Sequence, residues 1–304
     1  MRWSIPKPYY YASVIATTVG VGCLIKDYTG GEKYKGQEDL KGKVVIVTGA
    51  NTGIGKEIAH ELAARNAKVI LACRDREKCN EARRKIVVDT MNKFVYCREC
   101  DLASQESIRK FVERFKKENS ELHMLVNNGG VMRCPKSYTK EDVLKKSAPS
   151  RIINVSSAAH LKSKLKVQDL NSTEHYDPYE AYAQSKLANI LFTRELAKRL
   201  EGTKITVNAV HPGIVDTEIT RHMKFFNSFL SKIIIKPFLW PFIKSPKQGA
   251  QTVLYAALDP SLDNVTGSYF SNNQLAEISD EAKDDKLARW LWLVSEKWTK
   301  LNAT

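Results

Sequence analysis

A tyrosine and a lysine lie four residues apart in the stretch Tyr182-Ala-Gln-Ser-Lys186, and Ser157 closes the apolar run RIINVSS at residues 151–157. Residues at this spacing share one face of a helix, so the phenol and the ammonium group are neighbours. The pair alone is weak evidence, because a lysine-rich chain with 12 tyrosines should contain one by chance. Ser157 adds weight, because side chains at the carboxyl ends of parallel strands face the ligand crevice.

These three side chains could together catalyse a hydride transfer that is coupled to a proton transfer. The ammonium of Lys186 would stabilise the phenolate of Tyr182 and lower its pKa. Tyr182 would pass a proton to or from a substrate oxygen, and Ser157 would donate a hydrogen bond to that oxygen. Hydride would move at a bound nicotinamide. The sequence therefore predicts that Ser157, Tyr182 and Lys186 are catalytic, and it predicts no metal site.

A glycine-rich turn, TGANTGIG at residues 48–55, could hold the phosphates of that cofactor. It joins the first expected strand to the first expected helix, where backbone N–H groups and the helix dipole attract a pyrophosphate. The alternative is a tight turn that only needs the backbone freedom of glycine. The residues of this turn that we predict to contact the cofactor are Gly49, Asn51, Gly53, Ile54 and Gly55.

The ends of the next two strands indicate where the adenosine half of a dinucleotide would lie. The second strand ends in Cys73-Arg74-Asp75. The guanidinium of Arg74 favours the 2′-phosphate of NADP. The neighbouring Asp75 leaves room for NAD, which is the less favoured cofactor; alternatively, Asp75 caps the next helix. Asp101 and Leu102 follow the third strand and could contact the adenine. For Asp101 the alternative is the N-cap of a helix that begins near residue 104.

Apolar runs typical of buried strands alternate with helical stretches from residue 43 onward. The expected strands are 43–50, 68–74, 94–100, 123–128, 151–157, 204–213 and 267–270, and the expected helices are 55–67, 76–90, 104–119, 180–202 and 245–258. Such alternation predicts a parallel sheet that is covered by helices on both faces. The predicted fold class is therefore α/β, with one doubly wound Rossmann domain over residues 38–304.

With these motifs in place, the chain resembles the short-chain dehydrogenase/reductase superfamily and, within it, the membrane-anchored retinol dehydrogenases. The stretches that carry the resemblance are LIKDYTGG, TGANTGIGK, ACRDREKC, NNGGVMRCP, SAPSRIINVSSAAH, YAQSKLANILF and NAVHPGIVDTE. The resemblance implies the cofactor and catalytic roles given above, with Tyr182 and Lys186 also touching the cofactor. It adds nicotinamide contacts at Asn127, Pro212, Gly213 and Thr217. It implies NADPH-dependent reduction of retinaldehyde or another lipophilic carbonyl compound.

The connection between the fourth and fifth strands is shorter than the resemblance leads one to expect. Asn127 and Ser157 are 30 residues apart, and the relatives carry a long helix in this crossover that is missing here. The residues that remain can close a crossover, but only 140–147 could form a helix. We expect a preserved topology with less apolar burial, and the alternative function is a catalytically silent form that binds NADP(H) or a partner. The sequence makes no prediction about whether the chain forms a homodimer.

One segment near the N-terminus is apolar enough to cross a membrane. Residues 9–25 contain no charge and lie between Lys7 and Lys26. We predict an uncleaved anchor with a linker over residues 1–37, rather than a cleaved signal peptide. The resemblance favours the mitochondrial inner membrane, with the endoplasmic reticulum as the alternative. A second apolar run, residues 223–243, could be a lid that touches the membrane or a helix pair broken at Pro237 and Pro241.

Charge and cysteine content exclude some classes of protein. The chain has 48 Lys and Arg against 34 Asp and Glu, but the basic residues are scattered and no nucleic-acid-binding motif accompanies them, so no nucleic acid partner is predicted. Six cysteines in 304 residues are too few for a disulfide-stapled secreted domain. We expect reduced thiols, with Cys97 and Cys100 packing in a strand.

Overall fold

The computed structural model describes residues 6–130, 149–217 and 236–299, and its core is a sheet of eight strands. The strands are β1 Val44–Thr48, β2 Lys68–Cys73, β3 Val95–Glu99, β4 Met124–Asn127, β5 Ser150–Val155, β6 Ile205–His211, β7 Tyr269–Ser271 and β8 Gln274–Leu275. They are ordered β3-β2-β1-β4-β5-β6-β7-β8, and only β8 is antiparallel to its neighbour. All seven predicted strands are present, whereas β8 was not predicted.

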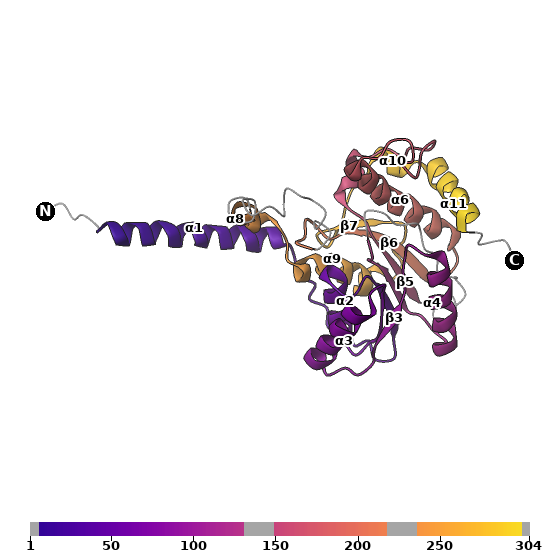
Figure 1. Cartoon of the computed structure of the whole chain (residues 1–304), viewed down its shortest axis with the longest axis horizontal. Helices are drawn as coiled ribbons and strands as arrows, with labels where there is room; N and C mark the ends of the chain where they lie inside the picture. The colour runs from indigo at the N-terminus through magenta and orange to yellow at the C-terminus, as the bar shows by residue number, and fades with distance from the viewer. Residues whose placement is uncertain (1–5, 131–148, 218–235, 300–304) are drawn as a thin grey trace.

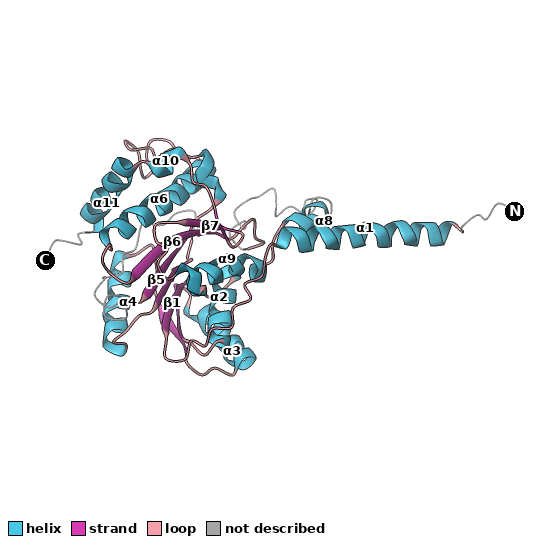
Figure 2. Cartoon of the chain, turned by 180° about the vertical axis from the view of Figure 1, so that it is seen from behind, coloured by secondary structure: helices cyan, strands magenta, loops and turns pink. Residues whose placement is uncertain are grey.

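Helices cover both faces of the sheet, as the alternating pattern predicted (Figure 1). On one face lie α2 Gly53–Ala64, α3 Arg76–Thr90 and α9 Pro246–Leu258. On the other lie α4 Gln105–Glu118, α6 Pro178–Arg199 and α11 Asp285–Thr299, with the short α10 Asp280–Lys283 beside them (Figure 2). The central strand β1 is buried along its whole length, which explains its unbroken apolar sequence VVIVT.

The order of the strands places a crevice between β1 and β4. The chain runs from β1 outward to β3 and then returns to β4 on the other side of β1. At such a switch point the connections leave the carboxyl edge of the sheet in opposite directions, and ligands bind between them. Val47 of β1 pairs with Val126 of β4, so the glycine-rich turn after β1 faces Asn127.

The connection between β4 and β5 keeps its parallel topology, with Asn127 opposite Asn154. Most of this crossover, including the expected helix at 140–147, lies outside the described residues. On the sheet face that α4 and α6 cover, Leu125 of β4 and Ile152 of β5 are each 3% exposed. The expected loss of burial is therefore not found at these two strands.

Two cysteines correct the expectation that all thiols are reduced. Cys79 of α3 and Cys97 of β3 form a disulfide, with their Cα atoms 6.0 Å apart. The strand expected around Cys97 is confirmed as β3, and Cys100, just after it, is buried. The pairing depends on a helix lying over its neighbouring strand, and so the spacing of the cysteines along the chain did not indicate it.

The predicted anchor forms the helix α1 Lys7–Gly30, which projects from the domain (Figure 1). It is the one described helix that is long and apolar enough to span a membrane, with a mean hydropathy of 1.3 and no burial in its apolar window. The segment that follows α1, residues 31–40, packs against the domain. Tyr34 N–H donates to Gln251 Oε1 (2.9 Å), Arg65 donates to the carbonyl of Gly36 (2.8 Å), and Leu40 is buried in the core.

Candidate active site

The structure brings the three predicted catalytic residues together at the carboxyl edge of the sheet. Ser157 follows β5 and is the N-cap of the 3₁₀ helix η1 Ala158–Lys162. Tyr182 and Lys186 lie one turn apart in α6, and the Lys186 Nζ atom is 5.5 Å from the centre of the Tyr182 ring. The side chains of Tyr182 and Ser157 are hydrogen-bonded to each other. This is the arrangement that a proton transfer at a shared substrate oxygen requires.

Local sequence fixes where α6 begins and therefore where Tyr182 lies. Asp177 is the N-cap, and its carboxylate accepts hydrogen bonds from the backbone N–H groups of Tyr179 (2.9 Å) and Glu180 (2.8 Å). Pro178 occupies the first position of the helix, where its missing N–H costs nothing. Because the helix begins at this point, Tyr182 comes one turn into it and Lys186 a turn later.

The pKa shifts of Tyr182 and Lys186 differ from the expectation. Burial raises the pKa of Tyr182, and the hydrogen bond from Ser157 only partly opposes this effect. The lowering by Lys186 that we expected is not found. Burial also lowers the pKa of Lys186 to about 8, because its ammonium group has left bulk water. Close to neutral pH the lysine is therefore poised between its charged and neutral forms, a range suited to a group that relays protons.

A polar network that the sequence analysis missed holds Lys186 in place. Lys186 Nζ donates to the carbonyl oxygen of Val155 (3.2 Å), which also accepts from Asn189 Nδ2 (3.0 Å). The backbone carbonyl of Lys186 accepts from the hydroxyl of Ser156 (2.7 Å). The lysine is only 7% exposed, so these bonds replace water that it has lost.

A second set of polar contacts ties the predicted nicotinamide residue Asn127 to α6. Asn127 Nδ2 donates to Asn154 Oδ1 (2.8 Å), and Asn154 Nδ2 donates to the hydroxyl of Thr193 (2.9 Å). Asn154 interrupts an apolar strand, and Asn189 and Thr193 follow Lys186 at helical spacing. Polar residues at positions where a buried strand or helix face should be apolar were the signal that could have revealed this network.

The glycine-rich turn has the geometry of an anion-binding loop. Gly49 and Gly53 have positive φ angles of 63° and 57°, a backbone conformation that glycine adopts readily. A Cβ atom at Gly55 would lie 2.4 Å from Asn128 Nδ2 and 2.5 Å from the Gly49 carbonyl oxygen, so a side chain does not fit there. The N-cap of α2, Thr52, makes no side-chain capping bond, and the first turn contains no acidic residue. The helix N-terminus therefore fits a phosphate.

Residues after β4 hold the turn from the other side of the crevice. Asn128 Nδ2 donates to the carbonyl of Thr48 (3.0 Å), and the N–H of Gly129 donates to the Thr48 hydroxyl (2.8 Å). A Cβ atom at Gly129 would lie 2.8 Å from Leu102 Cδ1. The glycine at 129 thus leaves room for Leu102, one of the two residues predicted to contact the adenine.

The three residues predicted for the adenosine half, Arg74, Asp101 and Leu102, follow β2 and β3 at the outer end of the same edge. Arg74 is exposed at the end of β2. The Asp75 carboxylate accepts from the N–H of Lys78 (3.0 Å) and caps α3, so the capping alternative holds for Asp75. Asp101 accepts from the N–H of Ala103 (3.0 Å), but it is Ser104 that caps α4. Asp101 is therefore not the helix cap.

The segment after β6 reaches back over the glycine-rich turn. Pro212 is buried, and Gly213 has a φ of 90°. A Cβ atom at Gly53 would lie 3.3 Å from Thr217 Cγ2, which shows how closely Thr217 approaches the turn. The predicted nicotinamide residues Asn127, Gly213 and Thr217 thus surround the same crevice as Gly49 and Gly53, although they are far apart in the sequence.

Two histidines adjoin the predicted catalytic residues. His160 is fully buried, its Nδ1 lies 2.7 Å from the carbonyl oxygen of Ser157, and its ring packs against Tyr269 at 4.9 Å. His211 ends β6, and burial, followed by repulsion from Lys244, His160 and Lys186, lowers its pKa to about 4. Both rings are therefore neutral near pH 7, since burial also lowers the pKa of His160.

The shifted pKa of His211 predicts acid sensitivity. The unfolded chain binds a proton at His211 below about pH 6.5, whereas the folded chain resists it until about pH 4, so stability falls as the pH falls through this window. A shift of this size corresponds to about 3 kcal/mol. Urea unfolding in detergent at pH 7 and pH 4 should show that His211→Asn loses about 3 kcal/mol less than the unaltered chain. Equal losses in the two proteins would contradict the prediction.

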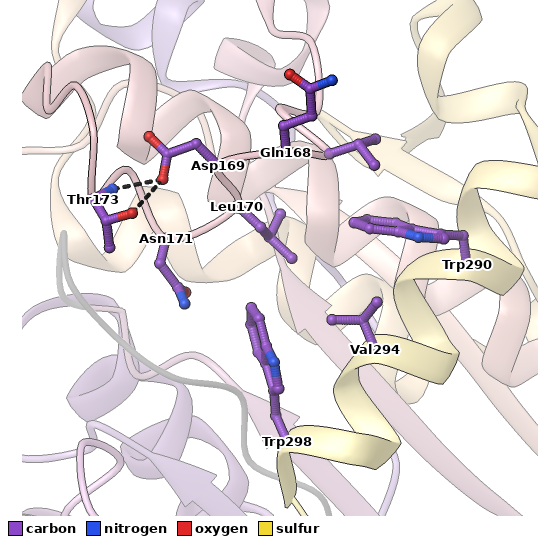
Figure 3. Close-up of a pocket in the computed structure, with 9 residues that line it drawn as sticks. Gln168, Asp169, Leu170, Asn171, Thr173, Trp290, Val294 and Trp298 are labelled. Carbon is purple, nitrogen blue, oxygen red and sulfur yellow. Dashed lines mark hydrogen bonds between the residues drawn. The ribbon is translucent and has the colours of Figure 1, made fainter.

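A pocket elsewhere in the structure contains none of the predicted site residues. It lies between the loop 167–173 and α11, whose Trp290, Val294 and Trp298 face it (Figure 3). Asp169 turns away from these rings and binds the N–H and hydroxyl of Thr173 (2.6 and 2.8 Å). We therefore assign the chemistry to the crevice at the carboxyl edge and not to this pocket.

Known proteins resemble this chain over most of its length. Residues 43–225 match the family model described as short chain dehydrogenase. Retinol dehydrogenase 13 from Mus musculus is 45% identical over 307 residues, which cover 94% of this chain and 92% of the relative. Retinol dehydrogenase 12 from the same species is 47% identical over 277 residues, which cover 84% and 86%.

Solved structures resemble the fold as well. A crystal structure of an uncharacterised protein from Mycobacterium paratuberculosis has a TM-score of 0.67 and 31% identity, covering 89% of this chain and 98% of that one. RhlG from Pseudomonas aeruginosa, solved as an active-site complex with NADP, has a TM-score of 0.62 and 25% identity, covering 78% and 97%. Both likenesses extend across the sheet and its helices.

The alignments also bear on the short crossover. The comparison with the mouse retinol dehydrogenase 13 spans 307 positions, yet 94% of a 304-residue chain supplies fewer residues than that. This chain therefore carries gaps against the relative.

Proposed function

This chain belongs to the short-chain dehydrogenase family of oxidoreductases, and on that premise we propose that it reduces retinaldehyde to retinol with NADPH. The observation that carries the proposal is the meeting of Ser157, Tyr182 and Lys186 at the carboxyl edge, beside the crevice that the glycine-rich turn closes. A Cβ atom at Gly130, which follows β4, would lie 3.6 Å from Lys186 Nζ, so the catalytic group and the crevice adjoin. The similarity to retinol dehydrogenases supports a lipophilic alcohol and carbonyl pair as substrates.

The residues of this chain have distinct roles in the proposed reaction. When bound, NADPH supplies the hydride that adds to the carbonyl carbon. Ser157 donates a hydrogen bond to the carbonyl oxygen, and Tyr182 transfers its phenolic proton to the same oxygen, which becomes the hydroxyl of the alcohol. Lys186, whose pKa burial lowers to about 8, then returns a proton to the phenolate. The Val155 carbonyl holds the lysine, and Asn189 binds the same carbonyl.

The cofactor preference rests on Arg74. Asp75 uses its carboxylate to cap α3, which leaves the exposed Arg74 guanidinium as the group suited to a 2′-phosphate at the end of β2. The relative solved with NADP supports the same choice, with NAD(H) less favoured.

Replacing Arg74 by alanine should raise the KM for NADPH by about tenfold or more, because a hydrogen bond to a charged group contributes about 1.5–3 kcal/mol. The KM for NADH should stay unchanged. Arg84→Ala is the matched control. Arg84 is an exposed arginine in the middle of α3, away from the end of β2 where Arg74 lies. Steady-state kinetics with both cofactors would test this, and an equal effect on NADH would contradict it.

The proposed location follows from α1. The uncharged residues 9–25 within this exposed helix would anchor the chain in a membrane, while residues 38–304 form the catalytic domain. We propose the mitochondrial inner membrane, with the endoplasmic reticulum as the alternative. A fluorescent fusion that gives only a reticular signal would reject the mitochondrial assignment.

The gaps against the relatives favour a second candidate, a catalytically silent form that binds NADP(H) without turnover. NADPH consumption with retinaldehyde decides between the two. The purified full chain should be compared with a version in which the crossover of a relative replaces residues 131–148. Turnover in both supports the proposed enzyme. Turnover only in the restored version, with a melting temperature that NADPH still raises in both, supports the silent form.

A further inference from the structure

A short apolar segment beside α1 has no role in the proposed chemistry. Residues Lys236–Leu239 form α8, and Trp240–Phe242 form the 3₁₀ helix η4. Phe238, Trp240 and Phe242 are 76%, 47% and 55% exposed, and Ile214 on the adjoining segment is 72% exposed. We call these four residues the anchor-side surface. Three large side chains exposed within five residues are costly in water and indicate a surface that meets something apolar.

The last turns of α1 are fixed to this segment by specific contacts. The Lys26 ammonium donates to the carbonyl oxygens of Trp240 (2.9 Å) and Ile243, and it lies 5.2 Å from the centre of the Trp240 ring. The Thr29 hydroxyl donates to the carbonyl of Pro241. Gly22, Lys26 and Thr29 follow at helical spacing, so one face of α1 rests against η4 (Figure 1).

These contacts fix the depth of the segment relative to a membrane that α1 would cross. A Cβ atom at Gly22 would lie 3.8 Å from Pro241 and 3.9 Å from the Trp240 ring. Gly22 belongs to the uncharged residues 9–25, which at 1.5 Å per residue measure about 25 Å, less than the roughly 30 Å of a hydrocarbon core. The bilayer must therefore extend to the end of this run, and η4 lies beside it at the same depth.

We propose that the anchor-side surface inserts into the lipid bilayer beside α1 and seats the rim of the active site against the membrane. The proposal rests on α1 being an anchor, as in the proposed function. Trp240 and the nearly fully exposed Tyr28 suit the membrane interface, where amphipathic rings accumulate. The Lys26 charge is bound by carbonyl oxygens at the depth where it would otherwise face lipid.

The same segment is joined directly to the crevice. Lys244 follows Ile243, its N–H donates to the carbonyl of Ile214 (2.7 Å), and Val215 and Lys244 form a parallel bridge. A Cβ atom at Gly213 would lie 2.9 Å from the Lys244 side chain. Ile214 of the anchor-side surface thus directly follows Gly213 at the crevice, and a lipophilic substrate dissolved in the bilayer reaches the site without crossing bulk water.

Spin labelling of the full chain in phosphatidylcholine liposomes tests the insertion. Cys23 and Cys134 are replaced by alanine, and a nitroxide is attached through Phe238→Cys, Phe242→Cys or, as control, Met91→Cys. Met91 is 81% exposed at the end of α3, toward the opposite edge of the sheet. We expect collisions with oxygen to exceed those with a water-soluble nickel complex at 238 and 242, and the reverse at 91. A polar environment at 238 and 242 overturns the proposal.

Two further measurements distinguish a failure of the insertion from a failure of the membrane anchor or of the proposed enzymatic function. Release of the chain by carbonate extraction would overturn the anchor itself, whereas a retained chain with polar labels at 238 and 242 would overturn the insertion alone.

In the double variant Phe238→Ser and Phe242→Ser, the KM for retinaldehyde in liposomes should rise about tenfold, with an unchanged KM for a short water-soluble aldehyde. An equal change for both aldehydes overturns the delivery of substrate from the bilayer. The labelling result does not depend on activity, so it stands even if the chain is catalytically silent.

Discussion

Replacing Tyr182 by phenylalanine is expected to reduce kcat by a factor of at least about 10²–10⁴, which is the usual contribution of a positioned proton donor. Phenylalanine keeps the ring that packs 5.5 Å from Lys186 Nζ and removes only the hydroxyl that is hydrogen-bonded to Ser157. The fold and the crevice should therefore remain intact. The measurement is NADPH consumption with retinaldehyde, together with the rise in melting temperature that NADPH produces, which should be unchanged.

Tyr179→Phe is the matched control for this variant. Tyr179 lies in the first turn of the same helix and is 56% exposed, so its hydroxyl should not affect turnover. Unchanged turnover in Tyr182→Phe would reject Tyr182 as the proton donor and with it the proposed mechanism. A loss of both turnover and the NADPH-induced rise would indicate a damaged fold instead.

Replacing Gly55 by alanine is expected to abolish cofactor binding and to lower stability by about 1–3 kcal/mol, the usual effect of overpacking a closely packed site. The new methyl group would meet Asn128 Nδ2 at 2.4 Å and the Gly49 carbonyl oxygen at 2.5 Å. The second contact is with backbone, so relief requires the turn itself to move. Moving the turn displaces the N–H groups that would hold the phosphates.

Gly130→Ala provides the comparison, because its Cβ atom would meet Lys186 Nζ at 3.6 Å, an ordinary van der Waals distance. Urea unfolding and isothermal titration with NADPH should show a loss of stability and of binding in Gly55→Ala, with little change in Gly130→Ala. Full NADPH affinity in Gly55→Ala would show that the cofactor does not rest on this turn.

The local signals of the chain were sufficient for the order of strands β1 to β7 and of the helices α2, α3, α4, α6 and α9. The VVIVT strand, the glycines that follow it and the proline and aspartate that open α6 act through short-range backbone preferences, so each can be interpreted in isolation. The rule that carboxyl ends of parallel strands share an edge then placed Ser157 near Tyr182 and Lys186. For this reason the fold was predicted correctly, and the three residues predicted to be catalytic lie together in the structure.

The sequence could not give the properties that depend on burial and on contacts between distant segments. Burial, which is a property of the whole fold, decided that the pKa of Tyr182 rises, contrary to the lowering expected from Lys186. The pairing of Cys79 with Cys97 required a helix to lie over its neighbouring strand.

The attachment of α1 to the domain also depended partly on local sequence and partly on tertiary contacts. Its sequence identified an apolar run that could span a membrane, but the binding of Lys26 to the carbonyls of Trp240 and Ile243 joins segments more than 200 residues apart. The sequence alone determined which elements form and which chemical groups they carry, because short-range preferences fix both. Only the tertiary structure decided how water is excluded around those groups and which distant segments meet, because both depend on the packing of the entire chain.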